Sequence, residues 1–129
     1  MSDFYGLVEK ICFRDKRYKA DAYEFLLQGL EFTQKKLKRN THVSGAELSM
    51  GLKEYAINQY GALAGRVLSY WGINNTRDFG NIVFNMIENK LLSKTEEDSL
   101  ADFDGVYDFK TVFSNVLADS VIAGLRAKL

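Results

Sequence analysis

The amino-acid sequence predicts an all-α protein in which about six helices pack as one compact bundle, a single domain over residues 1–129. Apolar residues recur at helical spacing along almost the whole chain. The chain also contains no proline, a residue that helix interiors tolerate poorly, and its length is that of one ordinary domain. A short β-hairpin near residues 91–109 is the only departure from helix that the pattern suggests.

The first two helices are predicted from their apolar stripes. The first begins after Ser2, a residue type that caps helix N-termini. Its apolar residues are Phe4, Leu7, Val8, Ile11 and Cys12. A charged connection over residues 14–19 follows. The second helix, over residues 21–39, is apolar over much of its circumference, which indicates a central position in the bundle.

Capping and stop signals delimit the next helices. Ser44 and Glu47, three residues apart, form the pattern of a capping box and predict the start of the third helix. Gly72 is the expected C-terminal stop of the fourth helix, since glycine readily adopts the left-handed conformation found there. Asn75 or Thr76 is expected to cap the fifth helix.

An acidic segment separates the fifth helix from the last one. Residues 93–108 carry six acidic residues and one lysine, and we expect them to be irregular. The hairpin, if formed, would pair residues 91–94 with residues 106–109. An amphipathic helix over residues 109–125 is expected to end the domain.

Five glycines lie inside helical patterns, where each costs about 1 kcal/mol relative to alanine. They are Gly29, Gly51, Gly65, Gly80 and Gly124. Close approach of neighbouring helices would explain why glycine occurs at these positions.

Composition narrows the functional classes. Seventeen Lys and Arg balance seventeen Asp and Glu, whereas nucleic-acid binders usually carry a basic excess. A net charge near zero removes the repulsion that keeps copies apart and favours self-association.

The N-terminus lacks a signal-peptide pattern, and no apolar run approaches the ~20 residues of a membrane helix. A cytoplasmic protein without membrane contact is therefore expected, and its one cysteine allows no internal disulfide.

Four motifs occur in order along the chain. They are RDxRYxxxAYxF (residues 14–25), HVSGxEL (42–48), WGINNTRDFGNIVF (71–84) and LLSKTEEDSLADF (91–103). With them the sequence resembles a family of small bacterial proteins of unknown function, over roughly residues 4–113. The resemblance implies a bacterial, cytoplasmic protein and carries over no catalytic residue.

Four polar side chains could form an active site if they converge. Asp15, Arg17, Tyr18 and His42 would supply a carboxylate, a guanidinium, a phenol and the chain's only imidazole. Otherwise Asp15 and Arg17 pair within the connection between two helices, and His42 is a loop residue near a helix end. One His and one Cys do not make a zinc site, and no glycine-rich phosphate motif is present. We therefore expect no metal, no cofactor and no enzymatic activity, with a small enzyme as one alternative.

A winged-helix-like nucleic-acid binder is the other alternative. Three helices followed by a hairpin match its order of elements, and helix 76–90 would read the bases. Its polar stripe of Arg77, Asn81 and Asn85 has the residue types that contact base edges. Asp78 beside this stripe and the acidic segment would repel phosphate, so nucleic acid is the weaker expectation.

The favoured hypothesis is a non-enzymatic protein-interaction or self-associating helical module. Four aromatic residues do not fit the inward stripes of their helices, namely Tyr5, Tyr60, Tyr70 and Phe84. Exposed aromatic side chains are enriched in protein interfaces. The partner would be another protein or a second copy of this chain.

Overall fold

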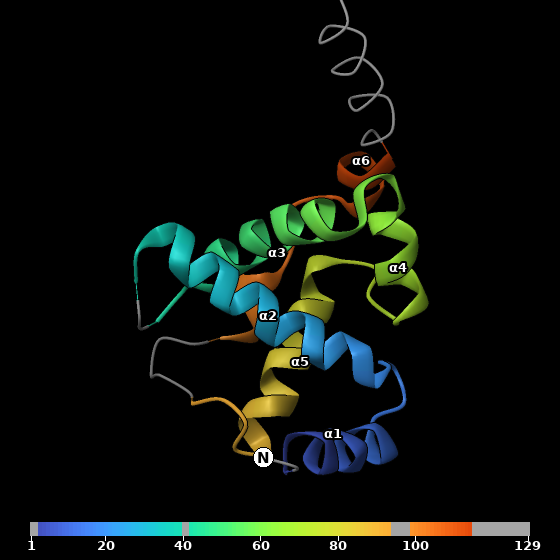
Figure 1. Ribbon diagram of the computed structural model, residues 1–129, viewed down its shortest axis with the longest axis vertical. Coiled ribbons are helices and arrows are strands. Elements are labelled where there is room, and N and C mark those ends of the chain that lie inside the picture. Colours follow the sequence, from blue (N-terminus) through green and yellow to red (C-terminus); the bar gives the residue numbers. More distant parts are fainter. Residues whose placement is uncertain (1–2, 40–41, 94–98, 115–129) are drawn as a thin grey trace, which may run out of the picture.

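The computed structural model describes residues 3–39, 42–93 and 99–114, and every regular element within them is helical (Figure 1). The α-helices are α1 (Asp3–Arg14), α2 (Ala20–Leu37), α3 (Gly45–Tyr60), α4 (Ala64–Tyr70), α5 (Thr76–Glu88) and α6 (Phe109–Ser114). Two short 3₁₀-helices are η1 (Gly61–Leu63) and η2 (Leu100–Phe103). The all-α prediction is confirmed.

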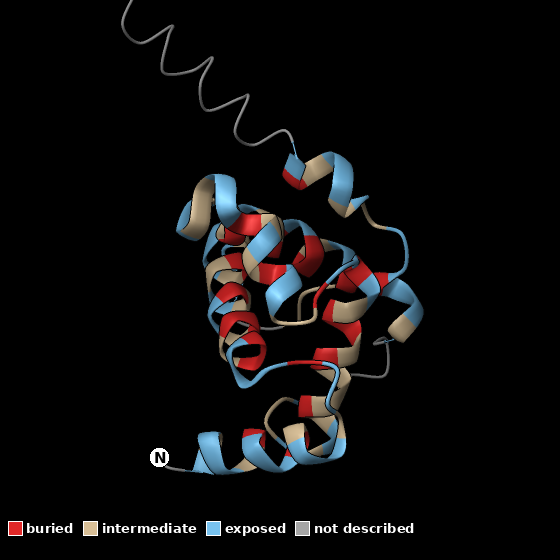
Figure 2. Cartoon of the chain, turned by 90° about the vertical axis from the view of Figure 1, so that its right-hand side faces the viewer, coloured by how far each residue is buried: buried red, intermediate tan, exposed pale blue. Residues whose placement is uncertain are grey.

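Helix α2 lies at the centre of the bundle, as predicted from the apolar residues that cover much of its circumference. It packs against α1, α3 and α5, and α5 in turn packs against η2 (Figure 1). Tyr23, Phe25 and Leu26 of α2 are almost fully buried, as are Phe79 and Ile82 of α5. Buried residues therefore line the inward sides of the helices, while exposed residues cover their outer sides (Figure 2).

Glycines allow α2 and α3 to approach closely, as expected. A Cβ atom added to Gly51 would lie 2.7 Å from both Cβ and Cγ2 of Thr33 on α2. A Cβ atom added to Gly29 would overlap the side chain of Leu52 on α3. Gly124 lies outside the described residues.

Local signals set the helix starts and stops. The Ser44 hydroxyl accepts a hydrogen bond from the Glu47 amide at 3.1 Å, and the Glu47 carboxylate accepts one from the Ser44 amide at 3.0 Å. This confirms the predicted capping box of α3. Asn75, not Thr76, caps α5 through a hydrogen bond from the Asp78 amide. The fourth helix ends before Gly72, whose φ of +96° favours glycine.

The expected hairpin is not formed within the described residues. Residues 91–93 and 106–109 contain no strand, and position 94 lies outside the described part. The Thr76 hydroxyl donates a hydrogen bond to the Phe103 carbonyl at 2.6 Å and accepts one from the Val106 amide at 3.2 Å. A side chain of α5 thus satisfies the Val106 amide, at the start of one of the two segments that the hairpin would have paired.

Among the described helices, none is long and apolar enough to cross a membrane. The last helix is described only as far as Ser114, so the predicted continuation to position 125 lies outside the described residues.

Candidate functional site

The connection between α1 and α2 is tied by an ion pair. Arg17 Nη2 lies 2.6 Å from Asp15 Oδ2, and Arg17 Nε lies 2.9 Å from Asp15 Oδ1. The Arg17 amide also donates to the Asp15 carboxylate at 3.1 Å. This bidentate geometry is the stronger form of an Arg–carboxylate pair. The predicted pairing of Asp15 with Arg17 is present.

Tyr18 extends this polar cluster to α5. Its side chain is buried, and its hydroxyl donates a hydrogen bond to Asp78 Oδ1 at 2.5 Å. The side-chain amide of Asn81 donates to the same hydroxyl oxygen at 2.8 Å. Burial, followed by the hydrogen bond to Asp78, raises the pKa of Tyr18 above its ordinary value.

Asn85 of α5 links Asp15 to Tyr23 of α2. Its amide nitrogen lies 2.9 Å from Asp15 Oδ2 and 3.0 Å from the Tyr23 hydroxyl. The hydrogen bonds from Arg17, and then the one from Asn85, hold the pKa of the Asp15 carboxyl well below its ordinary value, although burial opposes them. We call this set the polar clasp: Asp15, Arg17, Tyr18, Tyr23, Asp78, Asn81 and Asn85.

The pKa shifts within the polar clasp fit a structural role better than a role in proton transfer. A general acid or base works best when its pKa lies near the working pH. In the clasp the pKa of Asp15 moves further below neutrality, and the pKa of Tyr18 moves further above it. Both side chains therefore keep one protonation state near pH 7, as members of a structural hydrogen-bond network do.

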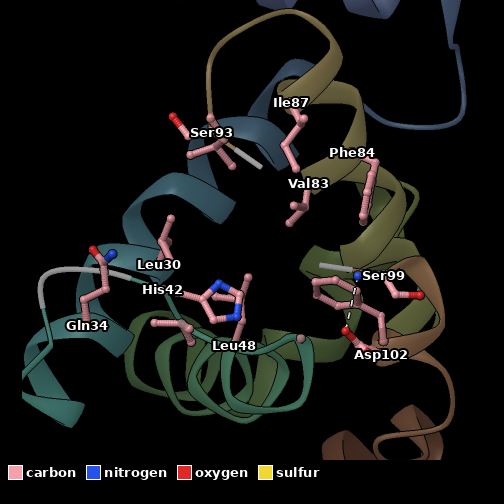
Figure 3. Close-up of a pocket in the computed structure, with 14 residues that line it drawn as sticks. Leu30, Gln34, His42, Leu48, Val83, Phe84, Ile87, Ser93, Ser99 and Asp102 are labelled. Carbon is pink, nitrogen blue, oxygen red and sulfur yellow. Dashed lines mark hydrogen bonds between the residues drawn. The ribbon is translucent and has the colours of Figure 1, made fainter. Parts of the chain in front are cut away.

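His42 lies at the other end of α2. Asp15, Arg17 and Tyr18 precede this helix and His42 follows it (Figure 1), and 18 residues of α-helix span about 27 Å. The imidazole of His42 instead lines a pocket with Leu30 and other side chains (Figure 3). The structure thus brings three of the four candidate catalytic residues together and places the fourth apart.

The candidate base-reading stripe is engaged within the protein. Arg77 Nη1 lies 2.7 and 2.9 Å from the two carboxylate oxygens of Asp104. Asn81 and Asn85 donate their hydrogen bonds inside the polar clasp. The three side chains therefore do not form one free polar face, and this geometry gives no support to base reading by α5.

Cys12 is half-buried on α1, and its thiol donates to the Tyr18 carbonyl at 3.7 Å. Burial raises the pKa of this thiol, which lowers the fraction of reactive thiolate.

Across residues 3–39, 42–93 and 99–114, no three His, Cys, Asp or Glu side chains are grouped so that they could hold a metal ion.

Two exposed aromatic side chains, Phe13 and Tyr70, flank the same connection, and a third, Tyr5, lies near the start of α1. The exposed fractions are 80% for Phe13, 71% for Tyr70 and 61% for Tyr5. Lys16 Nζ lies 5.2 Å from the centre of the Phe13 ring, and Lys19 Nζ lies 4.8 Å from the centre of the Tyr70 ring. Phe13, Lys16, Lys19 and Tyr70 are called the aromatic–cationic surface below.

The backbone joins the two parts of this surface. The Lys19 amide donates to the Trp71 carbonyl at 3.1 Å, so the start of α2 is bound to the end of α4. In addition, Gly72 has room only for a hydrogen atom against the Arg17 carbonyl. The aromatic residues of α1 and α4 are consequently held on either side of one connection.

Sequence reasoning found part of this surface. Tyr5 and Tyr70 are exposed, in agreement with their positions off the apolar stripes. Tyr60 and Phe84, chosen on the same grounds, are half-buried. Phe13 was not predicted to be exposed, although it follows Cys12 and falls outside the apolar stripe of its helix, which was the available signal.

Comparison with known proteins gives no further guide. No family model, curated protein or solved structure matches the chain. The resemblance to a bacterial family therefore stays a prediction from the four motifs.

Proposed function

We propose that this chain is a non-enzymatic protein-interaction module that self-associates through the aromatic–cationic surface. The observation that carries the proposal is Phe13, a large aromatic side chain that is 80% exposed and lies beside a lysine. Aromatic residues that become buried on binding supply much of the affinity of protein interfaces. A cation over an aromatic ring gains strength when the pair is desolvated by a partner.

Charge distribution favours a second copy of the chain as the partner. Residues 10–19 contain five Lys and Arg and one Asp, whereas residues 93–108 contain six acidic residues and one Lys. In the described part of the acidic segment, Asp102 and Asp104 are exposed. The basic region of one copy would attract the acidic segment of another, because complementary charge guides association. The expected contact is head-to-tail.

We also place the protein in the bacterial cytoplasm. The motif resemblance supports this setting. The single cysteine is consistent with it, since a reducing compartment makes no use of disulfide bonds.

Sedimentation velocity over a concentration series tests the proposal. The wild-type chain should show a mass that rises with concentration, and less so at about 0.5 M salt than at about 0.05 M, because salt screens exposed charges. Phe13→Ala should weaken association about tenfold or more. Met50→Ala is the matched control, since Met50 is exposed on α3 outside this surface. A chain that is monomeric at all concentrations up to about 100 µM, well above typical interface affinities, would contradict self-association.

A further inference from the structure

A pocket lies between α2, α3, α5 and η2 (Figure 3), and none of the residues described as lining it belongs to α1 or to the α1–α2 connection. Its volume is about 300 Å³. Leu30 of α2, Leu48 of α3, and Val83 and Ile87 of α5 form its apolar walls (Figure 3). We call it the His42 pocket, after the one imidazole that faces it.

The pocket leaves apolar side chains of α2 and α5 incompletely covered. Protein cores are packed about as densely as organic crystals, and no buried side-chain nitrogen or oxygen in the described residues lacks a hydrogen-bond partner. Leu30, Val83 and Ile87 lie on the inward sides of their helices but stay half-buried. Solvent therefore reaches apolar side chains that a filled core would cover, and a ligand that replaced this water would bury them.

Aromatic rings and polar groups define what the pocket can hold. Phe84, Phe103 and the imidazole of His42 present three rings to it. His42 approaches from one side, while Asp102 and Ser99 of the η2 region lie on the opposite side (Figure 3). One oxygen of Asp102 accepts a hydrogen bond from the Ser99 amide at 3.3 Å. A carboxylate has about four acceptor positions, so Asp102 can accept a further hydrogen bond from a ligand.

We propose that the His42 pocket binds a small planar aromatic molecule that carries one N–H or O–H donor. The volume is at the lower end of the range for small-molecule sites, about 300 to 1,000 Å³, which favours one or two fused rings. The surrounding rings would contact the ligand by stacking or by their edges. The donor would face the Asp102 carboxylate and fix the orientation of the ligand. The pocket shares no residue with the aromatic–cationic surface, but Ser99 and Asp102 belong to the acidic segment that the proposed self-association uses, so binding is tested on the monomer.

Indole is a suitable probe, because it has two fused rings and one N–H donor. The measurement is a titration followed by the methyl resonances of the wild-type protein, at a protein concentration and salt at which it is monomeric. Saturable shifts should appear at the methyl groups of Leu30, Val83 and Ile87. Leu63 is the internal control, because it is 57% exposed and lies outside the pocket. A dissociation constant on the order of 1 mM or tighter is expected for a ligand of this size.

Two comparisons sharpen the test. 1-Methylindole lacks the donor and should bind about tenfold more weakly than indole, as loss of one hydrogen bond to a charged or polar partner implies. Val83→Phe should fill the pocket and abolish indole binding without lowering the unfolding temperature, whereas Leu63→Phe should leave binding unchanged. Shifts that do not saturate, or that are equally large at Leu63, overturn the proposal, as does undiminished binding by folded Val83→Phe. If that variant does not fold, the map of wild-type methyl shifts decides the question alone.

Discussion

Replacement of Gly51 by alanine tests the close contact between α2 and α3. Gly51 is buried in α3 and faces Thr33 of α2. A Cβ atom at Gly51 would lie 2.7 Å from Cβ and Cγ2 of Thr33, and closer still to its hydroxyl oxygen. That hydroxyl donates a hydrogen bond to the Gly29 carbonyl at 2.7 Å. Thr33 therefore cannot turn away from the new methyl group without losing this bond, and the two helices would have to separate.

The size of the effect follows from three contributions. Alanine is favoured over glycine inside a helix by about 1 kcal/mol. Overpacking a tight core contact costs about 1–3 kcal/mol, and the loss of the Thr33 hydrogen bond costs about 1 kcal/mol more. We expect Gly51→Ala to lower the free energy of unfolding by about 1–3 kcal/mol. Gly6→Ala is the matched control, because a Cβ at Gly6 of α1 meets nothing within 4 Å.

Urea unfolding followed by far-UV circular dichroism measures both variants. Gly6→Ala should raise the free energy of unfolding by about 0.5–1 kcal/mol, so the two alanine variants should differ in sign. Thr33→Ala combined with Gly51→Ala should recover part of the loss, which a double-mutant cycle would report as a coupling between the two sites. If Gly51→Ala stabilises the protein as much as Gly6→Ala does, α2 and α3 are not in the close contact described.

Three further predictions concern acid stability, the tryptophan and the cysteine. Because Arg17 holds the pKa of Asp15 below its unfolded value, this pair contributes stability above about pH 4 and loses it as the pH falls toward the lower folded pKa. The unfolding free energy of Asp15→Asn should therefore vary less between pH 3 and pH 7 than that of the wild type, and equal slopes in urea titrations would refute this. Trp71→Ala should cost about 2 kcal/mol, less than a fully buried ring, because Trp71 is half-buried with its ring centre 5.6 Å from that of Phe25; a loss below about 1 kcal/mol would contradict this packing. The thiol of Cys12 should react with Ellman's reagent at least about tenfold more slowly in the folded protein than in urea, since burial raises its pKa, and equal rates would show that it is open to solvent.

Structural features that depend only on residues close together in the sequence were predictable from the sequence. The helical class follows from apolar spacing, and the capping box at Ser44 needs only a partner three residues away. The stop at Gly72 follows from the conformational freedom of glycine. The expected hairpin is absent from the described part of residues 91–109, where the Val106 amide donates its hydrogen bond to Thr76, a residue from another part of the chain.

The sequence by itself determined the helices, their ends and the supply of aromatic and charged residues. Only the tertiary structure decided which of these side chains meet. Tyr18 bonds with Asp78 sixty residues away, and Asn85 with Asp15 at a separation of seventy. His42, which the sequence grouped with Asp15 and Tyr18, lies beyond the far end of α2. The period of a helix can be recognised in a short stretch of sequence. The way two helices cross depends instead on surfaces that are far apart in the sequence. These crossings position both the polar clasp and the His42 pocket.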